Sequence, residues 1–330
     1  MDRKDLITKK ALLAIAFTGG LLIPQLPALS DPSNEAPDAL ISRVANTADI
    51  KPEMRACSLL QMAWNYSDGY GQEAAKTAAS PVINGWAKHP LATAHWESGL
   101  SSFAEEFCDD ERSEKRKIAK GKASRENTAL ASMAIHKALT DLDQSSSAFS
   151  KIVLYFIASR LCQKIGDTEG LNKCFRVLEP VERSCKQDPA ADEETAKALS
   201  VILNAQAYGV IPLHIPARPL SAPNAEKLES PATEVTEQTF KECEKLRLRA
   251  AAITDRLPAT NDLRRRAHRD LVIWYMQMGK PELAERQKQV LFELVGVNDD
   301  SILYPQSIMC GQVAWWHPEK VEVGGACGMG

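Results

Sequence analysis

The sequence predicts an all-α protein, and three observations support that fold class. Apolar side chains recur at intervals of three and four residues along most of the chain, which is the period of an amphipathic helix. No series of short segments alternates apolar and polar residues in the way that strands do. One stretch, residues 262–296, combines the helical period with the turn residues of a helical hairpin.

The N-terminal segment, residues 1–30, resembles a secretory signal peptide. A basic start is followed by an apolar run over residues 11–23, and the small residues Ala28 and Ser30 predict cleavage before Asp31. An uncleaved anchor is the alternative, although the apolar run is shorter than the roughly 20 residues that span a bilayer. The basic residues are Arg3, Lys4, Lys9 and Lys10. The sequence therefore predicts export to the periplasm or secretion.

The rest of the chain divides by composition. Residues 31–51 are rich in Pro, Asn, Asp and Ala and are expected to be a flexible lead-in, and residues 52–209 have the pattern of a helical domain. Five prolines in residues 210–233 predict either a linker or an ordered crossover, because proline is excluded from helix interiors. Residues 234–297 return to the helical period, and residues 298–330 form an irregular tail.

Within the helical domain the apolar spacing predicts a series of helices. Pro180 is expected to end one of them and Gly209 to end the last, since both residues disfavour a helix interior. Prolines and a glycine at positions 81, 85 and 90 predict irregular connections. The predicted helices cover residues 53–66, 91–107, 127–142, 149–165, 168–178 and 192–208, followed by 234–256 after the linker.

The hairpin at residues 262–296 is the clearest local prediction. Asp262 is the expected N-cap of its first helix, Gly279 breaks that helix, and Pro281 suits the first turn of the second because its missing N–H has no partner there. Gly296 then ends the second helix. Two amphipathic helices joined by so short a turn are expected to lie antiparallel and to bury their apolar faces.

The residues Leu271, Tyr275, Gly279 and Ala284 are spaced as in a tetratricopeptide repeat, which this region, residues 267–296, resembles. In that family the first helix carries Leu and then Tyr, the turn carries Gly, and the second helix carries a small Ala. The resemblance implies helical hairpins of the repeat type, although His268, Val272 and Lys288 depart from the residues that the family favours.

A second, looser match to the same pattern covers residues 155–178 and centres on Gly166 and Asp167. Tyr155 stands at the position of the family's first-helix aromatic and Phe175 at that of its second-helix aromatic. Cys162 and Leu171 replace the Tyr and the Ala of the pattern.

Eight cysteines in a chain predicted to be exported favour a disulfide framework. Buried free thiols are one alternative. Zinc is the other, but structural zinc sites bring ligands two to four residues apart, and the nearest cysteines here, Cys174 and Cys185, are 11 positions apart. The cysteines are Cys57, Cys108, Cys162, Cys174, Cys185, Cys243, Cys310 and Cys327.

The last two cysteines are predicted to pair with each other. Cys310 and Cys327 are the only cysteines after Cys243, and they bracket a segment with little capacity for regular structure. A disulfide there would display Trp315 and Trp316 on a constrained loop as a possible recognition feature, whereas tail aromatics more often cover a nearby core.

One stretch raises the possibility of catalysis. Residues 96–100, Trp-Glu-Ser-Gly-Leu, resemble the sequence around the catalytic acid of lytic transglycosylases, and this resemblance implies that Glu97 protonates a glycosidic oxygen. The family's downstream Gly-Leu-Met-Gln stretch is missing. His89 and His95 suggest a metal site, but their spacing of six with Pro90 between them does not suit one helix face. No cofactor motif is found.

The net charge of −3 gives no reason to expect a nucleic-acid binder, because such proteins need a basic excess. No segment after the signal peptide is long and apolar enough to be transmembrane. The sequence therefore predicts an exported helical scaffold that binds a protein or peptide partner, with no identifiable catalytic site. The alternative is a peptidoglycan-cleaving enzyme that uses Glu97.

Overall fold

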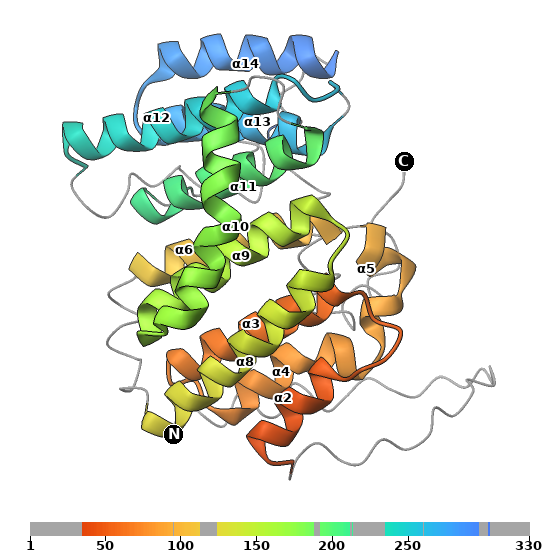
Figure 1. Cartoon of the computed structure of the whole chain (residues 1–330). Helices are drawn as coiled ribbons and strands as arrows, with labels where there is room; N and C mark the ends of the chain where they lie inside the picture. Colours follow the sequence, from red (N-terminus) through yellow and green to blue (C-terminus); the bar gives the residue numbers. More distant parts are fainter. Residues whose placement is uncertain are drawn as a thin grey trace, which may run out of the picture. The chain divides into compact units, whose positions relative to one another are not determined.

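The computed structural model describes residues 35–94, 96–112, 124–187, 192–211, 213, 235–259, 261–296 and 303, and in these residues it is all-α (Figure 1). They form twelve α-helices and one short 3-10 helix, and no strand occurs among them. The helices are α2 (Pro37–Ala45), α3 (Pro52–Ser67), α4 (Gln72–Ile83), η2 (Trp86–Lys88), α5 (Pro90–Ala94), α6 (Trp96–Arg112), α8 (Arg125–Gln144), α9 (Ala148–Ile165), α10 (Thr168–Gln187), α11 (Glu193–Val210), α12 (Glu237–Thr254), α13 (Asp262–Gln277) and α14 (Pro281–Val295).

The first group of helices surrounds α3, which packs against α8, α4 and α9. Helix α9 also contacts α10 and α11, and α6 packs against α11. Their buried apolar side chains form one cluster, which we call the N-terminal core. Within it the ring of Trp64 meets Phe107 edge to face at 5.4 Å between ring centroids, and Phe103 and Phe107 are fully buried. This packing of apolar residues on several helices is the expected source of stability for the region.

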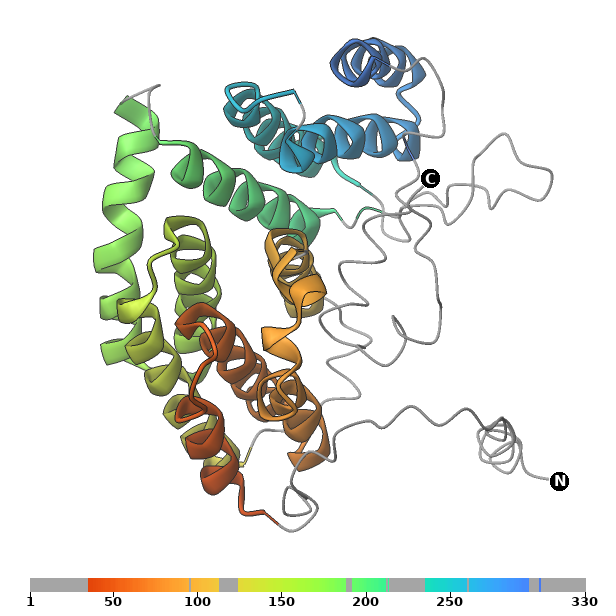
Figure 2. The ribbon, with the colours of Figure 1, turned by 90° about the vertical axis from the view of Figure 1, so that its right-hand side faces the viewer.

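A second cluster, the C-terminal core, joins the end of α11 to α12, α13 and α14. Trp274 on α13 is fully buried at its centre and stacks on Phe240 of α12 at 4.8 Å between centroids. Helix α11 contributes to both cores, with Val201 in the first and Ala207 in the second. Figure 2 shows α11 between α6 and the helices α12 to α14, in agreement with its contacts to α6, α12 and α13. The two cores therefore share a helix.

The predicted hairpin is confirmed in α13 and α14, which pack against each other. Gly279 in the connecting turn has φ of +66°, a conformation that residues with a Cβ rarely adopt, and Gly296 ends α14 at φ of +71°. The N-cap of α13 is Asn261 rather than the expected Asp262, because the Asn261 side chain accepts a hydrogen bond from the N–H of Leu263.

The expectation of a flexible lead-in through residue 51 was wrong for residues 37–45, which form α2. Pro37 begins this helix, and Leu40, Ile41 and Val44 are buried against α3, α4 and α8. The segment is short, and its three apolar residues follow a Pro-rich and polar start, so the helical period was hard to recognise. Packing against three neighbours stabilises a helix that is too short to be stable alone.

Proline and glycine also misled the sequence analysis in this region. Pro180 lies inside α10 rather than after it, and Pro81 lies inside α4, a helix that was not predicted. Gly209 lies inside α11, where an added Cβ would come within 3.2 Å of the Cys108 carbonyl oxygen on α6. The glycine there permits close approach of two helices instead of ending one.

Several predicted segments lie outside the described residues. They are the signal peptide, residues 214–233 of the Pro-rich segment, and the tail apart from Leu303. Trp315, Trp316, Cys310 and Cys327 belong to that tail, so their predicted roles stay predictions. Of the helices that are described, none combines the length and the apolar character needed to cross a bilayer.

Candidate functional site

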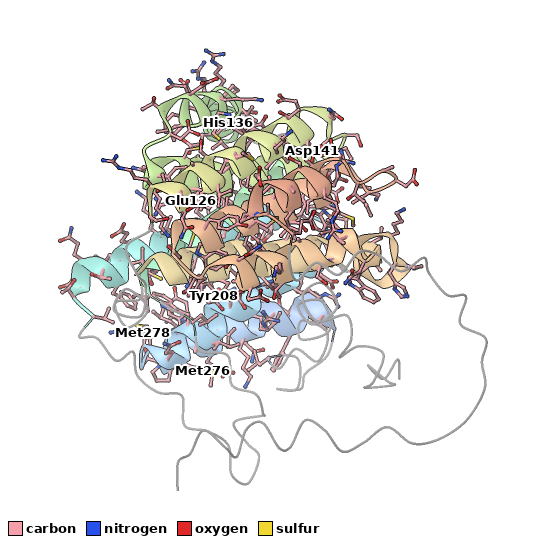
Figure 3. The ribbon with its side chains drawn as sticks, turned by 90° about the horizontal axis from the view of Figure 1, so that it is seen from below. Glu126, His136, Asp141, Tyr208, Met276 and Met278 are labelled. Carbon is pink, nitrogen blue, oxygen red and sulfur yellow. The ribbon has the colours of Figure 1, made fainter. Side chains whose placement is uncertain are left out.

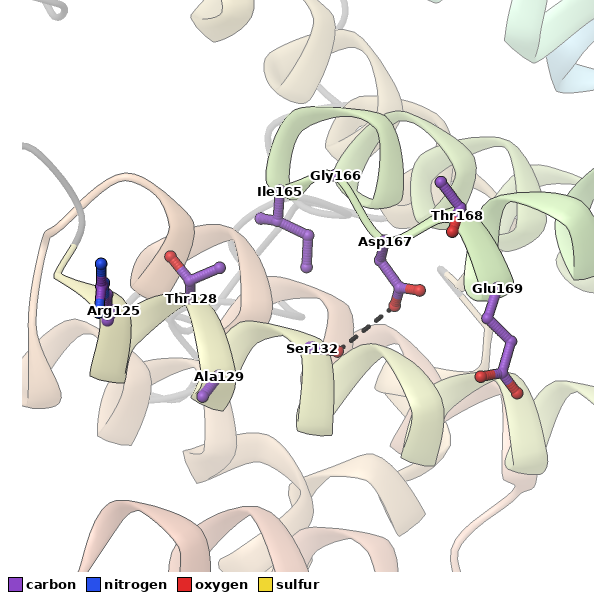
Figure 4. Close-up of a pocket in the computed structure, with 9 residues that line it drawn as sticks. All are labelled: Arg125, Thr128, Ala129, Ser132, Ile165, Gly166, Asp167, Thr168 and Glu169. Carbon is purple, nitrogen blue, oxygen red and sulfur yellow. Dashed lines mark hydrogen bonds between the residues drawn. The ribbon is translucent and has the colours of Figure 1, made fainter.

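An open groove lies beside the first half of α8, where the turn between α9 and α10 approaches it (Figure 4). Its volume is about 410 Å³. One wall consists of Arg125, Thr128, Ala129 and Ser132 on α8, and the other consists of residues 165–169. The groove is thus bounded by two segments that are about 40 positions apart in sequence.

The spacing of the α8 residues explains their common wall. Arg125, Thr128 and Ser132 follow one another at three and four positions, which places them on one face of a helix. Figure 4 shows Arg125 at one end of the groove and Glu169 at the other. Asp167 lies nearer to Glu169 than to Arg125. The groove therefore presents a positive charge at one end and negative charges at the other.

The opposite wall depends on the turn between α9 and α10. Gly166 ends α9 with φ of +75°, and the carboxylate of Asp167 accepts a hydrogen bond at Oδ1 from the N–H of Gly170, 2.9 Å away. Asp167 thereby caps the start of α10. Its other oxygen, Oδ2, accepts from Ser132 Oγ at 3.4 Å and lies 2.9 Å from His136 Nε2. These contacts fix the turn against α8.

Ser132, His136 and Asp167 are the residue types of a hydrolase triad, but their order in space is different. In a triad the histidine lies between the nucleophile and the carboxylate, so that it takes the proton of the serine. Here the carboxylate of Asp167 contacts both the serine and the histidine through the same oxygen. This arrangement stabilises the turn and does not supply the serine with a base.

Glu97 lies in the first turn of α6, half-buried, with Lys197 Nζ of α11 at 3.7 Å. Lys197 also lies 3.2 Å from Glu193 and 2.9 Å from Glu194. Burial raises the pKa of Glu97, the nearby carboxylates of Glu194 and Glu193 raise it further, and Lys197 opposes them. A single lysine thus faces three carboxylates, and the pKa of Glu97 is raised above its ordinary value.

A buried network of charged residues was missed by the sequence analysis. It links Glu105 of α6 to Arg266 and Asp270 of α13, and includes Arg269 and Arg247. Arg266 pairs with Glu105 across the two helices, and Arg269 Nη2 lies 2.7 Å from Asp270 Oδ1. Burial lowers the pKa of Arg266, but the negative charges of Glu105 and Asp270 raise it by more. Arg266 therefore stays charged.

Arg247 of α12 is almost fully enclosed, and only 1% of it is exposed. Its guanidinium lies 5.3 Å from the centroid of the Tyr208 ring and 5.9 Å from that of Trp274, and Nη2 donates to the Ile211 carbonyl at 3.4 Å. Tyr208, on α11, lies where the two cores meet (Figure 3). Aromatic faces stabilise a guanidinium that is removed from water. The sequence does contain a feature that could have indicated this buried network. Charged residues at positions 264–266 and 268–270 lie on the same helix as the apolar stripe.

Two of the histidines that the structure describes, His89 and His268, take structural positions. His268 is buried, with Nε2 2.9 Å from Asp255 Oδ1 and with Gln287 Nε2 2.5 Å from its Nδ1. His89 stacks on Trp86 at 4.3 Å between ring centroids, while His95 is outside the described residues. No group of three or more possible metal ligands occurs in the part of the chain that the structure describes.

The predicted disulfide framework does not appear among the described cysteines. Cys57, Cys162 and Cys174 are buried free thiols, and Cys108 and Cys243 are buried as well. Cysteine packs as a small apolar side chain, so it suits helix interfaces without a partner. The side chains of Cys185, Cys310 and Cys327 lie outside the description, and the predicted pairing of the last two stays a prediction.

Comparisons of the chain with protein-family models, with curated proteins and with solved structures found no match.

Proposed function

We propose that this protein is an exported helical scaffold that binds a protein or peptide partner in the groove between α8 and the turn that joins α9 to α10. The observation that carries the proposal is the open groove with Arg125 at one end and Asp167 and Glu169 towards the other. An extended segment with an acidic group near Arg125 and a basic group near Glu169 would match these charges. The predicted signal peptide supports an extracytoplasmic place of action.

Resemblance to tetratricopeptide repeats supports the same proposal. The hairpins α9–α10 and α13–α14 coincide with the two matching regions, and both turns contain a glycine with positive φ, Gly166 and Gly279. Tyr275 is buried as the repeat pattern requires. Phe175 departs from it, because 52% of this side chain is exposed instead of packed between helices.

Selection from a phage-displayed library of random peptides tests the groove. We expect peptides selected on the wild-type protein to lose binding to the Arg125→Glu and Glu169→Lys variants. The Lys137→Glu variant is the matched control, since Lys137 is exposed on the same helix but does not line the groove. Binding should weaken as salt is raised, because charged ends of a groove are screened.

Two outcomes would contradict the proposal that the groove binds a peptide. One is that no peptide is enriched; the other is that selected peptides bind all three variants as well as the wild type. Export has a separate test, namely N-terminal sequencing of the protein recovered from outside the cytoplasm. The expected first residue is Asp31.

The raised pKa of Glu97 favours a second candidate, a peptidoglycan-cleaving enzyme in which Glu97 is the general acid. A zymogram on peptidoglycan would show clearing by the wild-type protein and by Glu193→Gln, but none by Glu97→Gln. Glu193 is the control because it contacts the same lysine. No clearing by the wild-type protein would exclude this candidate and leave the groove proposal unaffected.

A further inference from the structure

Two of the buried cysteines face each other across the hairpin of α9 and α10. Cys162 lies in the last turn of α9, where its carbonyl accepts a hydrogen bond from the N–H of Asp167 at 2.8 Å. Cys174 lies on α10, and the residues between the two cysteines, 163–173, include the end of α9, the turn at Gly166 and Asp167, and the start of α10. Both side chains are fully buried.

The geometry of Gly170 shows how closely α10 approaches Cys162. A Cβ at Gly170 would lie 2.7 Å from Cys162 Sγ, so only a glycine leaves space for the sulfur at this point. Gly170 is one helical turn before Cys174 and therefore on the same face of α10. The two thiols lie close enough to form a hydrogen bond with each other. The sulfur of Cys162 thus points at the part of α10 that carries Cys174.

Two other roles for this pair are not supported. A metal site needs further ligands, and no group of three possible ligands occurs within the described ranges. A nucleophile needs a thiolate, whereas the hydrogen bond that the Cys162 thiol donates to Cys174, followed by burial, raises the pKa of Cys162. In the folded hairpin Cys162 is therefore a poor nucleophile.

We propose that Cys162 and Cys174 form a disulfide when the chain folds in an oxidising compartment, and that this bond clasps α10 to α9. The proposal rests on the export that the proposed function includes. Each thiol loses its proton and one electron as the S–S bond forms, and a dithiol–disulfide oxidoreductase accepts both electrons and both protons as its own disulfide becomes two thiols. The exchange takes place before the hairpin packs, because both side chains are buried afterwards and out of reach of the oxidoreductase.

The position of the pair links it to the groove. Residues 165–169, which form one wall, lie between the two cysteines in sequence. The main partner of α10 is α9, and its contacts with α8 and α11 are few. A covalent link between α9 and α10 would therefore hold the wall that carries Asp167 and Glu169.

The test uses the full mature chain, refolded from denaturant in a buffer of oxidised and reduced glutathione, and then mapped by mass spectrometry without reduction. The expected product is a cross-linked peptide pair that contains Cys162 and Cys174 and is two hydrogens lighter than the separate thiol peptides. Cys57→Ala is the control variant, since Cys57 is buried on α3, and it should retain the linked pair. A second measurement is the melting temperature, which reductant should lower for the wild type and for Cys57→Ala but not for Cys162→Ala/Cys174→Ala.

Recovery of both cysteines as free thiols after refolding, or of either one linked to a different residue, would overturn the pairing. The same mapping of protein taken from its native cells separates this result from a failure of export. Linked cysteines after refolding together with free cysteines in the native protein would refute the oxidising compartment. It would also show that the protein in the cell lacks this disulfide, although the two cysteines lie close enough to form one.

Discussion

The two cores differ in what they bury. In the N-terminal core the largest fully buried side chains are apolar or aromatic, and in its Arg55–Asp141 pair the arginine side chain remains 13% exposed. In the C-terminal core three arginines and an aspartate of α12 and α13 are almost fully buried, and one of the arginines, Arg266, pairs with Glu105 of α6. Apolar packing tolerates changes that conserve volume, whereas a buried charge depends on each of its partners. We therefore expect the two regions to respond differently to substitution.

The largest effect is expected from breaking the charge network. Arg266→Met removes the cation that pairs with Glu105 and leaves that carboxylate buried, which should lower the free energy of unfolding by about 3–5 kcal/mol. Combining it with Glu105→Leu removes the unpaired charge and should recover much of the loss. Urea unfolding of the wild type, the single variant and the double variant measures both steps.

A volume-conserving change in the N-terminal core is the matched control. Leu139→Met, at a fully buried position of α8, should cost less than about 1.5 kcal/mol. If Arg266→Met costs no more than this control, the buried pair does not contribute in the way that the comparison requires.

The next effect concerns apolar burial in the C-terminal core. Tyr275→Ala should lower the free energy of unfolding by about 3 kcal/mol, the range for removing a buried aromatic side chain. Tyr275→Phe keeps the ring and removes only the hydroxyl, which donates to Glu244 Oε1 at 3.0 Å, so it should cost about 1 kcal/mol. Thermal melting of the two variants separates ring from hydroxyl, and an unchanged melting temperature for Tyr275→Ala would show that α13 is not packed as described.

The smallest effect concerns α11, the helix that both cores share. Asp192 caps it by accepting from the N–H of Thr195 at 3.0 Å and from the Thr195 hydroxyl at 2.7 Å, and these bonds lower the pKa of Asp192. Asp192→Ala should cost about 1 kcal/mol near neutral pH. Because the folded pKa is lowered, this contribution is present above the unfolded value of about 3.9 and is lost as pH falls through the folded pKa.

Asp192→Asn sharpens that measurement, since asparagine also caps a helix but does not titrate. The free energy of unfolding of the wild type should fall more steeply than that of Asp192→Asn below about pH 4. Equal slopes for the two proteins in this range would contradict the assigned role of the carboxylate.

Local sequence predicted the elements whose signals are short in range. The hairpin of α13 and α14 was recognised because Gly279, Pro281 and Gly296 mark its turn and ends, and the helical period is regular on both sides. The predicted helix ends were wrong where a proline or glycine lies inside a helix, and at Gly209 the reason is contact with a neighbouring helix. Gly209 faces the backbone of α6, a contact with a residue about 100 positions earlier that no local rule contains.

The candidate sites show the same division. Glu97 could be named from its neighbours in sequence, but its lysine comes from α11 and only folding brings the two together. The groove was not predicted, since Arg125 and Ser132 look like an ordinary polar helix face until the turn at Asp167 lies against them. The pairing of Cys162 with Cys174 was one of many possibilities for eight cysteines before the hairpin placed them together.

The sequence alone determined that this chain is helical, where most helices lie and how α13 turns into α14, because helical period, capping and turn residues act over a few neighbouring positions. Tertiary structure decided which charges are buried, which two walls form the groove and which thiols meet. Each of these depends on contacts between residues far apart in the chain, such as Glu105 with Arg266, and the energy of such contacts comes from packing and desolvation that exist only in the folded protein.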